Sequence, residues 1–395
     1  MTCLMNDLLL QSDVQEYIRN TKFENKLSFQ KSPFTGIQMN ELVIQMVSKK
    51  KCEFKLPTWY GTPNILYPEK ISIEQSSSEI TAQYKSSFIK GTSLIDITGG
   101  FGVDAFYFKK QFEEVFHCEI QQELSEMVRH NFNVLETNVT CLSGNGLDIL
   151  QHLNRTFDCI YIDPSRRHQQ KGKVFKLEDY QPNVVELLEV YREYSKKILI
   201  KVSPLLDIHA AISDLKYIEE IHIIAVDNEV KELLFLLGEK INENPKVITV
   251  DFSKNKRVMF DFEYIEIQNN HLSSSTSPLK YLYEPNAAIM KSGGFYALSD
   301  KFKVEKLHKN SHLFTSNDFI EFPGRVFEID KTMAYQKSLM NEHLKNKKAN
   351  VTTRNFSENV ETIQKKWKIK DGGDTYLFFT TDQNNHKIVL FCKKV

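Results

Sequence analysis

The chain has 395 residues, and its 51 Lys and Arg residues balance its 51 Asp and Glu residues, so the formal net charge is zero. With 41% hydrophobic and 26% charged residues, the composition is that of an ordinary globular protein of two or three domains, and it argues against a polyanion binder that acts through its whole surface. No apolar run approaches the roughly 20 residues that span a bilayer, and residues 1–7 lack the basic segment of a secretion signal. We therefore expect a cytoplasmic protein that does not enter a membrane.

The cysteines give no sign of a metal site. No two of them have the close spacing that metal-binding cysteines show, and three lie in strand-like apolar runs, which favours buried, reduced thiols. We therefore expect no bound metal. The six cysteines are Cys3, Cys52, Cys118, Cys141, Cys159 and Cys392.

Residues 1–85 have a mainly helical pattern, and we expect them to cap the domain that follows. Residues 57–63, which begin and end with proline, are expected to interrupt these helices as a loop. Farther along, three serines at 76–78 precede Glu79, which is typical of a helix N-cap followed by an early acid.

The segment from Leu94 to Asp104 combines an apolar strand, an acid at its end, a glycine-rich turn and the start of a helix. In open α/β sheets, this arrangement forms a nucleotide-shaped crevice at the first strand. Glycines suit such a turn because a ligand must approach the backbone closely and because some turn residues need a positive φ. The cofactor-binding candidates of this segment are Asp96, Thr98, Gly99, Gly100, Gly102 and Asp104.

Two later segments are placed to complete the crevice. Glu119 ends the next strand-like stretch about 20 residues after the glycine turn, where a carboxylate can accept hydrogen bonds from ribose hydroxyls. Asn145 and Asp148 follow the third strand, and either could meet the adenine amine. Asp148 could equally be a helix cap.

The strand at 157–162 ends in Asp163 and Pro164, and proline stops strand pairing where the chain would turn out over the crevice. Asp163 is therefore a candidate for both cofactor binding and catalysis. Lys201 lies near the end of another apolar strand, 198–202, which should neighbour Asp163. The two side chains could form a structural ion pair or a catalytic one, since a partly buried lysine can orient a substrate or take its proton.

The residues directly after Asp163 are candidates for substrate binding. The two arginines among them could hold a phosphate or a carboxylate with their planar groups, or they could form surface ion pairs. These candidates are Pro164, Ser165, Arg166 and Arg167.

The glycine turn formally satisfies the dinucleotide pattern G-x-G-x-x-A over residues 100–105, so a nicotinamide dehydrogenase stays an alternative. A pyrophosphate favours the positive end of the following helix, whereas Asp96 and Asp104 flank the turn and would repel a dianion. Two carboxylates suit a ligand that carries an ammonium and a sulfonium and has no phosphate. The pattern therefore favours S-adenosylmethionine.

The apolar strands at 221–226 and 233–237 are joined by a short polar connection. We expect an antiparallel hairpin, because a parallel crossover needs about a dozen residues. A mostly parallel sheet that ends in one antiparallel hairpin is the plan of class I methyltransferases. Residues 269–278 form the clearest linker in the chain.

Beyond this linker we expect a small α+β segment at 279–325 and a final module at 326–395. The final module has thirteen Lys and Arg residues against eight Asp and Glu residues. This surplus permits contact with nucleic acid and equally fits a solvated lysine-rich surface. The candidate RNA contacts are Arg354, Lys365, Lys366 and Lys368.

Several tracts of the chain together resemble the class I S-adenosylmethionine-dependent methyltransferases that carry a ferredoxin-like segment and a C-terminal THUMP-like domain. The most specific are Asp163-Pro164-Ser165-Arg166-Arg167 and Tyr283-Glu284-Pro285-Asn286-Ala287-Ala288. Other matching tracts lie at 72–79, 96–104, 201–207, 353–356 and 372–374.

The resemblance implies an α/β fold with a Rossmann-like, doubly wound sheet whose last strand is antiparallel, and S-adenosylmethionine as the cofactor. The expected domains are a helical cap at 1–85, the methyltransferase domain at 86–267, the ferredoxin-like segment at 279–325 and the THUMP-like domain at 326–395. RNA is implied only loosely, because THUMP domains are associated with RNA modification.

The expected reaction is methyl transfer to a nucleophilic nitrogen or oxygen, with structured tRNA or rRNA as the expected substrate. We expect Asp163 to orient or deprotonate the acceptor and Lys201 to assist. Exocyclic-amine methyltransferases place a second proline and an aromatic residue where this chain has Ser165 and Arg166, a departure that argues against adenine-N6 methylation. No cysteine lies near these motifs to act as the nucleophile of pyrimidine C5 methylation. The alternatives are a small-molecule or protein substrate, or a catalytically inactive protein of this fold that binds RNA. No sequence feature sets the oligomeric state.

Overall fold

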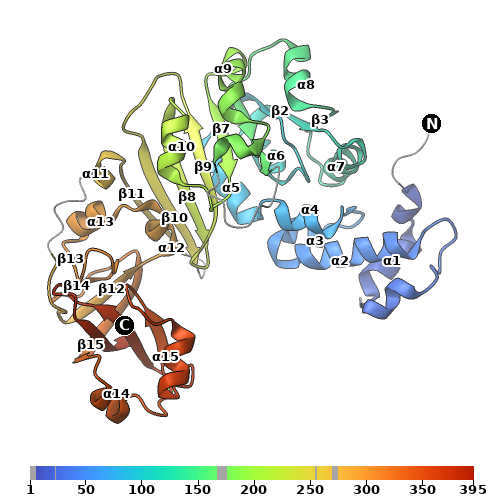
Figure 1. Ribbon diagram of the computed structural model, residues 1–395. Helices are drawn as coiled ribbons and strands as arrows, with labels where there is room; N and C mark the ends of the chain where they lie inside the picture. The colour runs from blue at the N-terminus through green and yellow to red at the C-terminus, as the bar shows by residue number, and fades with distance from the viewer. Residues whose placement is uncertain (1–5, 23, 167–175, 254–255, 269–274) are drawn as a thin grey trace. The chain divides into compact units, whose positions relative to one another are not determined.

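A computed structural model describes residues 6–22, 24–166, 176–253, 256–268 and 275–395 (Figure 1). The chain divides into two compact units, one comprising Met1–Glu219 with Leu234–Ile241 and the other Glu220–Leu233 with Asn242–Val395. Among the described residues, no helix combines the length and the apolar character that crossing a bilayer requires.

The N-terminal segment is helical, as the sequence predicts (Figure 1, blue). The expected loop at 57–63 is wrong in part, because Pro57–Gly61 forms a short helix, α3. Proline is favoured at the first helical position, where no N–H partner is needed, and the helix buries Trp59 completely. The elements are η1 (Asp7–Leu10), α1 (Ser12–Asn20), η2 (Asn25–Phe29), α2 (Met39–Lys55), α3, α4 (Lys70–Gln75) and α5 (Glu79–Phe88).

The predicted N-cap is present at the start of α5. The Ser78 side chain accepts a hydrogen bond from the Thr81 amide, and Glu79 lies in the first turn. Ser77, at the junction between α4 and α5, and Lys85 of α5 both lie inside the protein. Ser77 donates a hydrogen bond to Asp104 and accepts one from Lys85.

A large, mostly parallel sheet confirms the predicted α/β class. Its order is β11-β10-β8-β9-β7-β4-β1-β2-β3. Its first parallel strands are β1 (Gly91–Asp96), β2 (Phe112–Glu119), β3 (Thr140–Ser143), β4 (Cys159–Ile162) and β7 (Ile198–Val202). The helices that connect or follow them are α6 (Val103–Phe108), α7 (Gln122–Val134), α8 (Gly146–Leu153), α9 (Val184–Tyr194) and α10 (Ile208–Asp214).

The register of these strands brings the candidate residues to one edge. Asp96, the last residue of β1, lies opposite His117 of β2 and Tyr161 of β4. Ile162 of β4 lies opposite Ile200 of β7, so Asp163 and Lys201 each follow a paired position. The carboxyl ends of parallel strands are where open α/β sheets bind ligands.

The predicted hairpin consists of β8 (Ile218–Val226) and β9 (Glu229–Leu237), joined by Asp227 and Asn228, which both have positive φ. Asp and Asn at such positions are typical of a two-residue hairpin turn. We expected the sheet to end at this hairpin, but two more strands extend it. β10 (Lys246–Ser253) pairs in parallel with β8, and β11 (Lys256–Glu263) pairs antiparallel with β10.

The C-terminal part of the chain forms a second sheet, of order β13-β14-β12-β15-β18-β17-β16. β12 pairs with both β14 and β15, so the sheet is continuous through residues 279–325 and 326–395. One core cluster likewise combines Leu282 and Leu307 with Phe327 and Leu390. The strands are β12 (Tyr281–Pro285), β13 (Glu305–Lys306), β14 (Phe314–Ser316), β15 (Gly324–Ala334), β16 (Asn350–Thr353), β17 (Thr375–Thr381) and β18 (Lys387–Lys394). The helices from residue 265 onward are α11 (Ile265–Gln268), α12 (Ala287–Ser292), α13 (Phe295–Phe302), α14 (Lys337–His343) and α15 (Val360–Trp367).

Candidate active site

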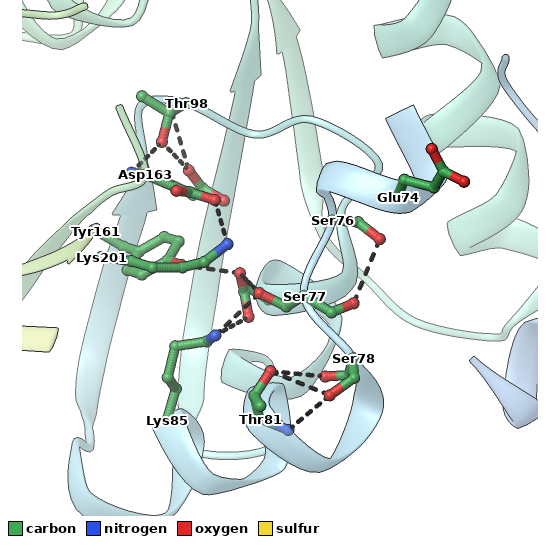
Figure 2. A network of polar contacts seen from close by, with 12 residues as sticks. Glu74, Ser76, Ser77, Ser78, Thr81, Lys85, Thr98, Tyr161, Asp163 and Lys201 are labelled. Carbon is green, nitrogen blue, oxygen red and sulfur yellow. Dashed lines mark hydrogen bonds and ion pairs between the residues drawn. The ribbon is translucent and has the colours of Figure 1, made fainter. Parts of the chain in front are cut away.

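The ends of β1 and β4 are joined through Thr98 (Figure 2). The Thr98 backbone amide and hydroxyl lie 2.9 and 3.2 Å from Oδ1 of Asp96. The same hydroxyl accepts a hydrogen bond of 2.7 Å from the Asp163 amide. Thr98 therefore orients the Asp96 carboxyl group and fixes the backbone of Asp163 at one edge of the sheet.

Asp96 is a buried carboxyl group whose ionised form is disfavoured by its surroundings. Burial raises its pKa well above the usual value, and the negative charges of Asp104 and Asp163 add to this shift, against hydrogen bonds from Thr98. A cation placed beside Asp96 would favour its ionised form. The site is therefore suited to a positively charged group such as an ammonium.

The glycine turn is fixed by two residues of β2, His117 and Glu119. A Cβ atom on Gly99 would lie 2.4 Å from Nε2 of His117, which is too close for any other residue. The Gly100 amide donates to Oε2 of Glu119 at 2.9 Å, and the Gln121 amide donates to the other carboxylate oxygen at 2.8 Å. Glu119 is thus held by two backbone amides, directly beside the turn.

His117 is a residue whose role the sequence did not reveal. Burial lowers the pKa of His117 to about 4, so the imidazole is neutral at pH 7. Its Nε2 lies 3.2 Å from the Gly100 carbonyl oxygen, which places the proton on that nitrogen. A lone histidine in a strand carries no signal for this contact, because it depends on the pairing of β1 with β2.

Gly102 supports the start of α6 in a different way. Its φ is +77°, a conformation that favours glycine. A Cβ atom there would also lie 2.7 Å from the Phe132 ring and 2.8 Å from Val128. Gly102 therefore lets the turn pack against α7, whereas Gly99 lets it pack against His117.

The ion pair expected between Lys201 and Asp163 is confirmed, with 2.5 Å between Nζ and Oδ2 (Figure 2). The Lys201 side chain is 10% exposed and that of Asp163 is 33% exposed. The lysine is therefore inside, and the carboxylate faces outward beside it. Both side chains come from the carboxyl ends of adjacent strands, as the sequence predicts.

Asp104 belongs to a buried network that the sequence did not predict. Its partners Ser77, Lys85 and Tyr161 are labelled in Figure 2. Its Oδ2 accepts hydrogen bonds from the hydroxyls of Ser77 and Tyr161, at 2.7 and 2.8 Å. Nζ of Lys85 lies 3.1 Å from Oδ1 of Asp104 and donates to Oγ of Ser77 at 2.9 Å. Burial alone would raise the pKa of Asp104, but the charges of Lys85 and Lys201 and these hydrogen bonds hold it below its usual value.

The pairing of Asp104 with Lys85 affects which carboxylates can attract a cationic cofactor. We expected Asp96 and Asp104 to present two free charges beside the turn. The charge of Asp104 is instead compensated by Lys85, whose side chain is fully buried. Asp96, with Glu119 nearby, is the stronger candidate for attracting a cationic ligand, and a direct contact of Asp104 with a cofactor stays a prediction.

The end of β3 offers exposed polar groups. Asn145 is the N-cap of α8, and its side chain accepts hydrogen bonds from the amides of Leu147 and Asp148 at 2.9 and 3.3 Å. The cap that we considered for Asp148 is therefore formed by Asn145. Both side chains are exposed, and their contact with adenine stays a prediction.

Ile120 directly follows Glu119 and is 68% exposed. An exposed isoleucine beside a carboxylate and the glycine turn offers an apolar surface to a ring. The sequence shows this residue only as the end of an apolar stretch, so its exposure could not be inferred.

The expected substrate-binding residues lie at the end of β4. Pro164 is buried and Ser165 is exposed. Ser165 and Arg166 form β5 (Ser165–Arg166), which pairs with β6 (Tyr180–Gln181). Arg167 lies outside the described residues. Within the part of the chain that the structure describes, no group of three or more His, Cys, Asp or Glu side chains is placed to hold a metal ion.

Three family models match successive parts of the chain. One, described as RNA cap guanine-N2 methyltransferase, matches residues 91–240. A ferredoxin-like domain matches residues 281–323, and a THUMP domain-like model matches residues 324–394. These matches confirm the resemblance seen in the sequence. No curated protein matches the chain.

The structure is similar to the crystal structure of a "putative methyltransferase" from Porphyromonas gingivalis W83, with a TM-score of 0.89 and 26% identity over 99% of each chain. TrmK of M. capricolum, solved with S-adenosyl-homocysteine, is similar at a TM-score of 0.32 and 13% identity, over 45% of this chain and 70% of its own. The chain contains a methyltransferase domain followed by ferredoxin-like and THUMP-like domains.

Proposed function

We propose that this methyltransferase, with S-adenosylmethionine as its methyl donor, methylates an exocyclic amine, other than adenine N6, of a base in RNA. The observation that carries the proposal is the outward-facing carboxylate of Asp163, held by Lys201 at 2.5 Å and by Thr98 at the end of β4. This is an oriented hydrogen-bond acceptor at the edge of the sheet where ligands of this fold bind.

The residues around the glycine turn fit the proposed cofactor. Burial raises the pKa of Asp96, and the charges of Asp104 and Asp163 add to this shift, so an ammonium beside the carboxyl group would favour its ionised form. Glu119 is fixed by the amides of Gly100 and Gln121 and keeps lone pairs for ribose hydroxyls. Ile120 offers exposed apolar surface for the adenine ring. Bound there, the cofactor supplies a methyl group on a positively charged sulfur.

The protein's own contribution is mainly positioning. The amine N–H of the acceptor would donate to Asp163, which directs the nitrogen lone pair toward the methyl carbon. A new N–C bond would form as the S–C bond of the donor breaks. The electron pair of the S–C bond would stay on sulfur, which would become neutral. The methylated nitrogen then loses one proton to Asp163 or to water. Lys201 keeps the carboxylate in place throughout.

Three observations support RNA as the acceptor. The family model over residues 91–240 describes a guanine-N2 methyltransferase that acts on RNA caps. Residues 324–394 match a THUMP domain-like model, and residues 326–395 carry a surplus of Lys and Arg. Together they favour a polyanionic substrate over a small molecule or a protein.

The experiment is a methyl-transfer assay with labelled S-adenosylmethionine and RNA from cells that lack the protein. We expect wild-type protein to label RNA, and Asp163→Asn to bind S-adenosylhomocysteine normally in calorimetry while losing most of its labelling. Glu113→Gln, an exposed carboxylate at the opposite end of β2, is the matched control. Label found only in small molecules or protein would overturn the RNA assignment, and full activity of Asp163→Asn would overturn the role of Asp163.

A further inference from the structure

The C-terminal unit contains a buried carboxylate that contacts two arginines. Glu284 of β12 is 3% exposed. Its Oε2 accepts hydrogen bonds from Nε and Nη2 of Arg325, and its Oε1 lies 2.7 Å from Nη2 of Arg354. The side chains of Arg325 and Arg354 are 38% and 37% exposed. Both arginine side chains are therefore held by Glu284 and remain partly exposed; Nη1 of Arg354 also donates to the Thr353 carbonyl oxygen at 3.3 Å, and its Nε is buried without a hydrogen-bond partner.

A third cation, Lys306, is buried nearby with no carboxylate. The residue is 3% exposed, and its ammonium donates to the Lys309 carbonyl oxygen at 3.0 Å. It also lies 4.8 Å from the centre of the Phe295 ring. Among the described residues, no carboxylate contacts Lys306, and burial lowers its pKa. A buried ammonium with one carbonyl partner keeps two donors for a further ligand.

Two contacts bring Lys306 and Arg354 into one cluster. His312 stacks on Phe295 at 4.0 Å between ring centres, so it shares that ring with Lys306. The side chain of Asn355, next to Arg354 in the chain, contacts Nδ1 of His308 at 2.9 Å. The segment 306–312 and the segment that carries Arg354 therefore pack together.

His312 reports on the charge of this cluster. Burial, together with the positive charges of Lys306 and Arg354, lowers the pKa of His312 to about 4. Its Nδ1 is buried without a hydrogen-bond partner. The imidazole is therefore neutral at pH 7. Lys306 and Arg354 both act on it, and Arg354 shares the carboxylate of Glu284 with Arg325.

We propose that Arg325, Arg354 and Lys306 form a binding site for a phosphate group. Guanidinium groups donate parallel hydrogen bonds to phosphate oxygens, and Glu284 holds both arginines ready for such a contact. The phosphate could belong to a small molecule or to an RNA chain, and both present the same oxygens to the site. The site is separate from the proposed methyl transfer and does not depend on it.

The test uses the full-length protein and two probes at constant ionic strength, inorganic phosphate and a short single-stranded oligoribonucleotide. Binding is measured by calorimetry, and the His312 ring signals are followed by NMR after their assignment with His312→Gln. We expect at least one probe to bind and to shift the His312 signals. Arg354→Gln and Lys306→Met should each weaken that binding about tenfold, which corresponds to roughly 1.4 kcal/mol.

Arg155→Gln is the matched control, because Arg155 is similarly exposed, at 41%, and pairs with Glu114 far from this unit in sequence. Binding of phosphate alone identifies a small phosphate ligand, and binding of RNA alone identifies a polynucleotide; either outcome supports the site if the variants weaken it. The proposal is overturned if neither probe binds, or if the wild-type protein binds without a shift of His312. It is also overturned if Arg155→Gln weakens binding as much as Arg354→Gln. Since the His312 signals are read in the wild-type protein, the result stands even where a variant fails to fold.

Discussion

The candidate active site and the arginine cluster of the C-terminal unit both contain buried carboxylates, but their charge surpluses have opposite signs. The active site brings four carboxyl groups together with two ammonium groups, whereas the cluster has one carboxylate and three cations. The groups are Asp96, Asp104, Glu119, Asp163, Lys85 and Lys201 in the first, and Glu284, Lys306, Arg325 and Arg354 in the second. A chain of zero net charge can thus hold one site suited to a cation and another suited to an anion.

The two regions also differ in how deeply the cations lie. The Lys85 side chain is completely buried against Asp104, while the two arginines on Glu284 remain more than one third exposed. The Lys85–Asp104 pair serves the fold, because the charge of Lys85 is already compensated by Asp104. A half-exposed pair leaves donors available to a ligand.

The largest expected effect is a difference in stability between variants of the buried pair and of the partly exposed pair. Lys85→Met leaves Asp104 buried without its nearest cation, and we expect a loss of about 3–5 kcal/mol in the free energy of unfolding. Arg325→Gln removes one of the two cations on Glu284, and because Arg354 remains and the Arg325 side chain is 38% exposed, we expect a smaller loss than for Lys85→Met. Urea unfolding of both variants measures the difference. Equal losses would contradict the distinction between a structural pair and an accessible one.

The next effect tests whether the glycine turn of the active site is fixed by packing. Gly99→Ala places a methyl group 2.4 Å from His117, and such overpacking typically costs about 1–3 kcal/mol. Because the turn must move, we expect S-adenosylhomocysteine binding to fall below detection in calorimetry. Gly61→Ala is the control, since a Cβ atom on Gly61 meets nothing within 4 Å. Normal binding by Gly99→Ala would show that the turn does not approach the ligand.

A smaller effect tests the cation preference of the active site. The pKa of Asp96 is raised by burial and by Asp104 and Asp163, so in the free protein the carboxyl group is protonated at low pH. An ammonium favours the ionised form, so binding releases a proton. The affinity for S-adenosylhomocysteine should therefore rise as the pH rises through the acidic range, until the ligand amine loses its own charge at alkaline pH.

Asp96→Asn should remove this rise and weaken binding about tenfold to a hundredfold at pH 7, since a hydrogen bond to a charged group contributes about 1.5–3 kcal/mol. Calorimetry in buffers of different ionisation enthalpy measures the released proton. An unchanged pH profile in Asp96→Asn would assign the proton to another group.

The smallest expected effect concerns the exposed apolar surface beside Glu119. Ile120→Ala removes methyl and methylene groups that a bound ring would cover, and each contributes about 0.8 kcal/mol. We expect S-adenosylhomocysteine to bind about tenfold more weakly, with no change in stability because Ile120 is exposed in the free protein. Ile241→Ala changes a similarly exposed isoleucine elsewhere and should leave binding unchanged. If both variants bind like the wild type, Ile120 does not contact the ligand.

Much of the active site follows from local sequence. The strand, acid and glycine turn around Asp96 predict a ligand-binding edge, and the regular order of strands and helices places Asp163 near Lys201. These features depend on residues close together in the chain and on the parallel pairing of successive strands. The extension of the sheet beyond the hairpin was not predicted, because the sequences of β10 and β11 do not reveal which edge of the sheet these strands join.

The amino-acid sequence by itself determined the fold class, the glycine turn and the residues at the strand ends, because strand periodicity, turn chemistry and chain order are local properties. Only the tertiary structure decided which charges meet. Lys85 reaches Asp104 from a helix of the N-terminal segment, His117 supports Gly99 through the register of β1 and β2, and Arg325 and Arg354 meet on Glu284 through a shared sheet. Such contacts join residues that are far apart in the chain, so no spacing in the sequence encodes them; the packing of the folded chain brings them together and sets the charge of each site.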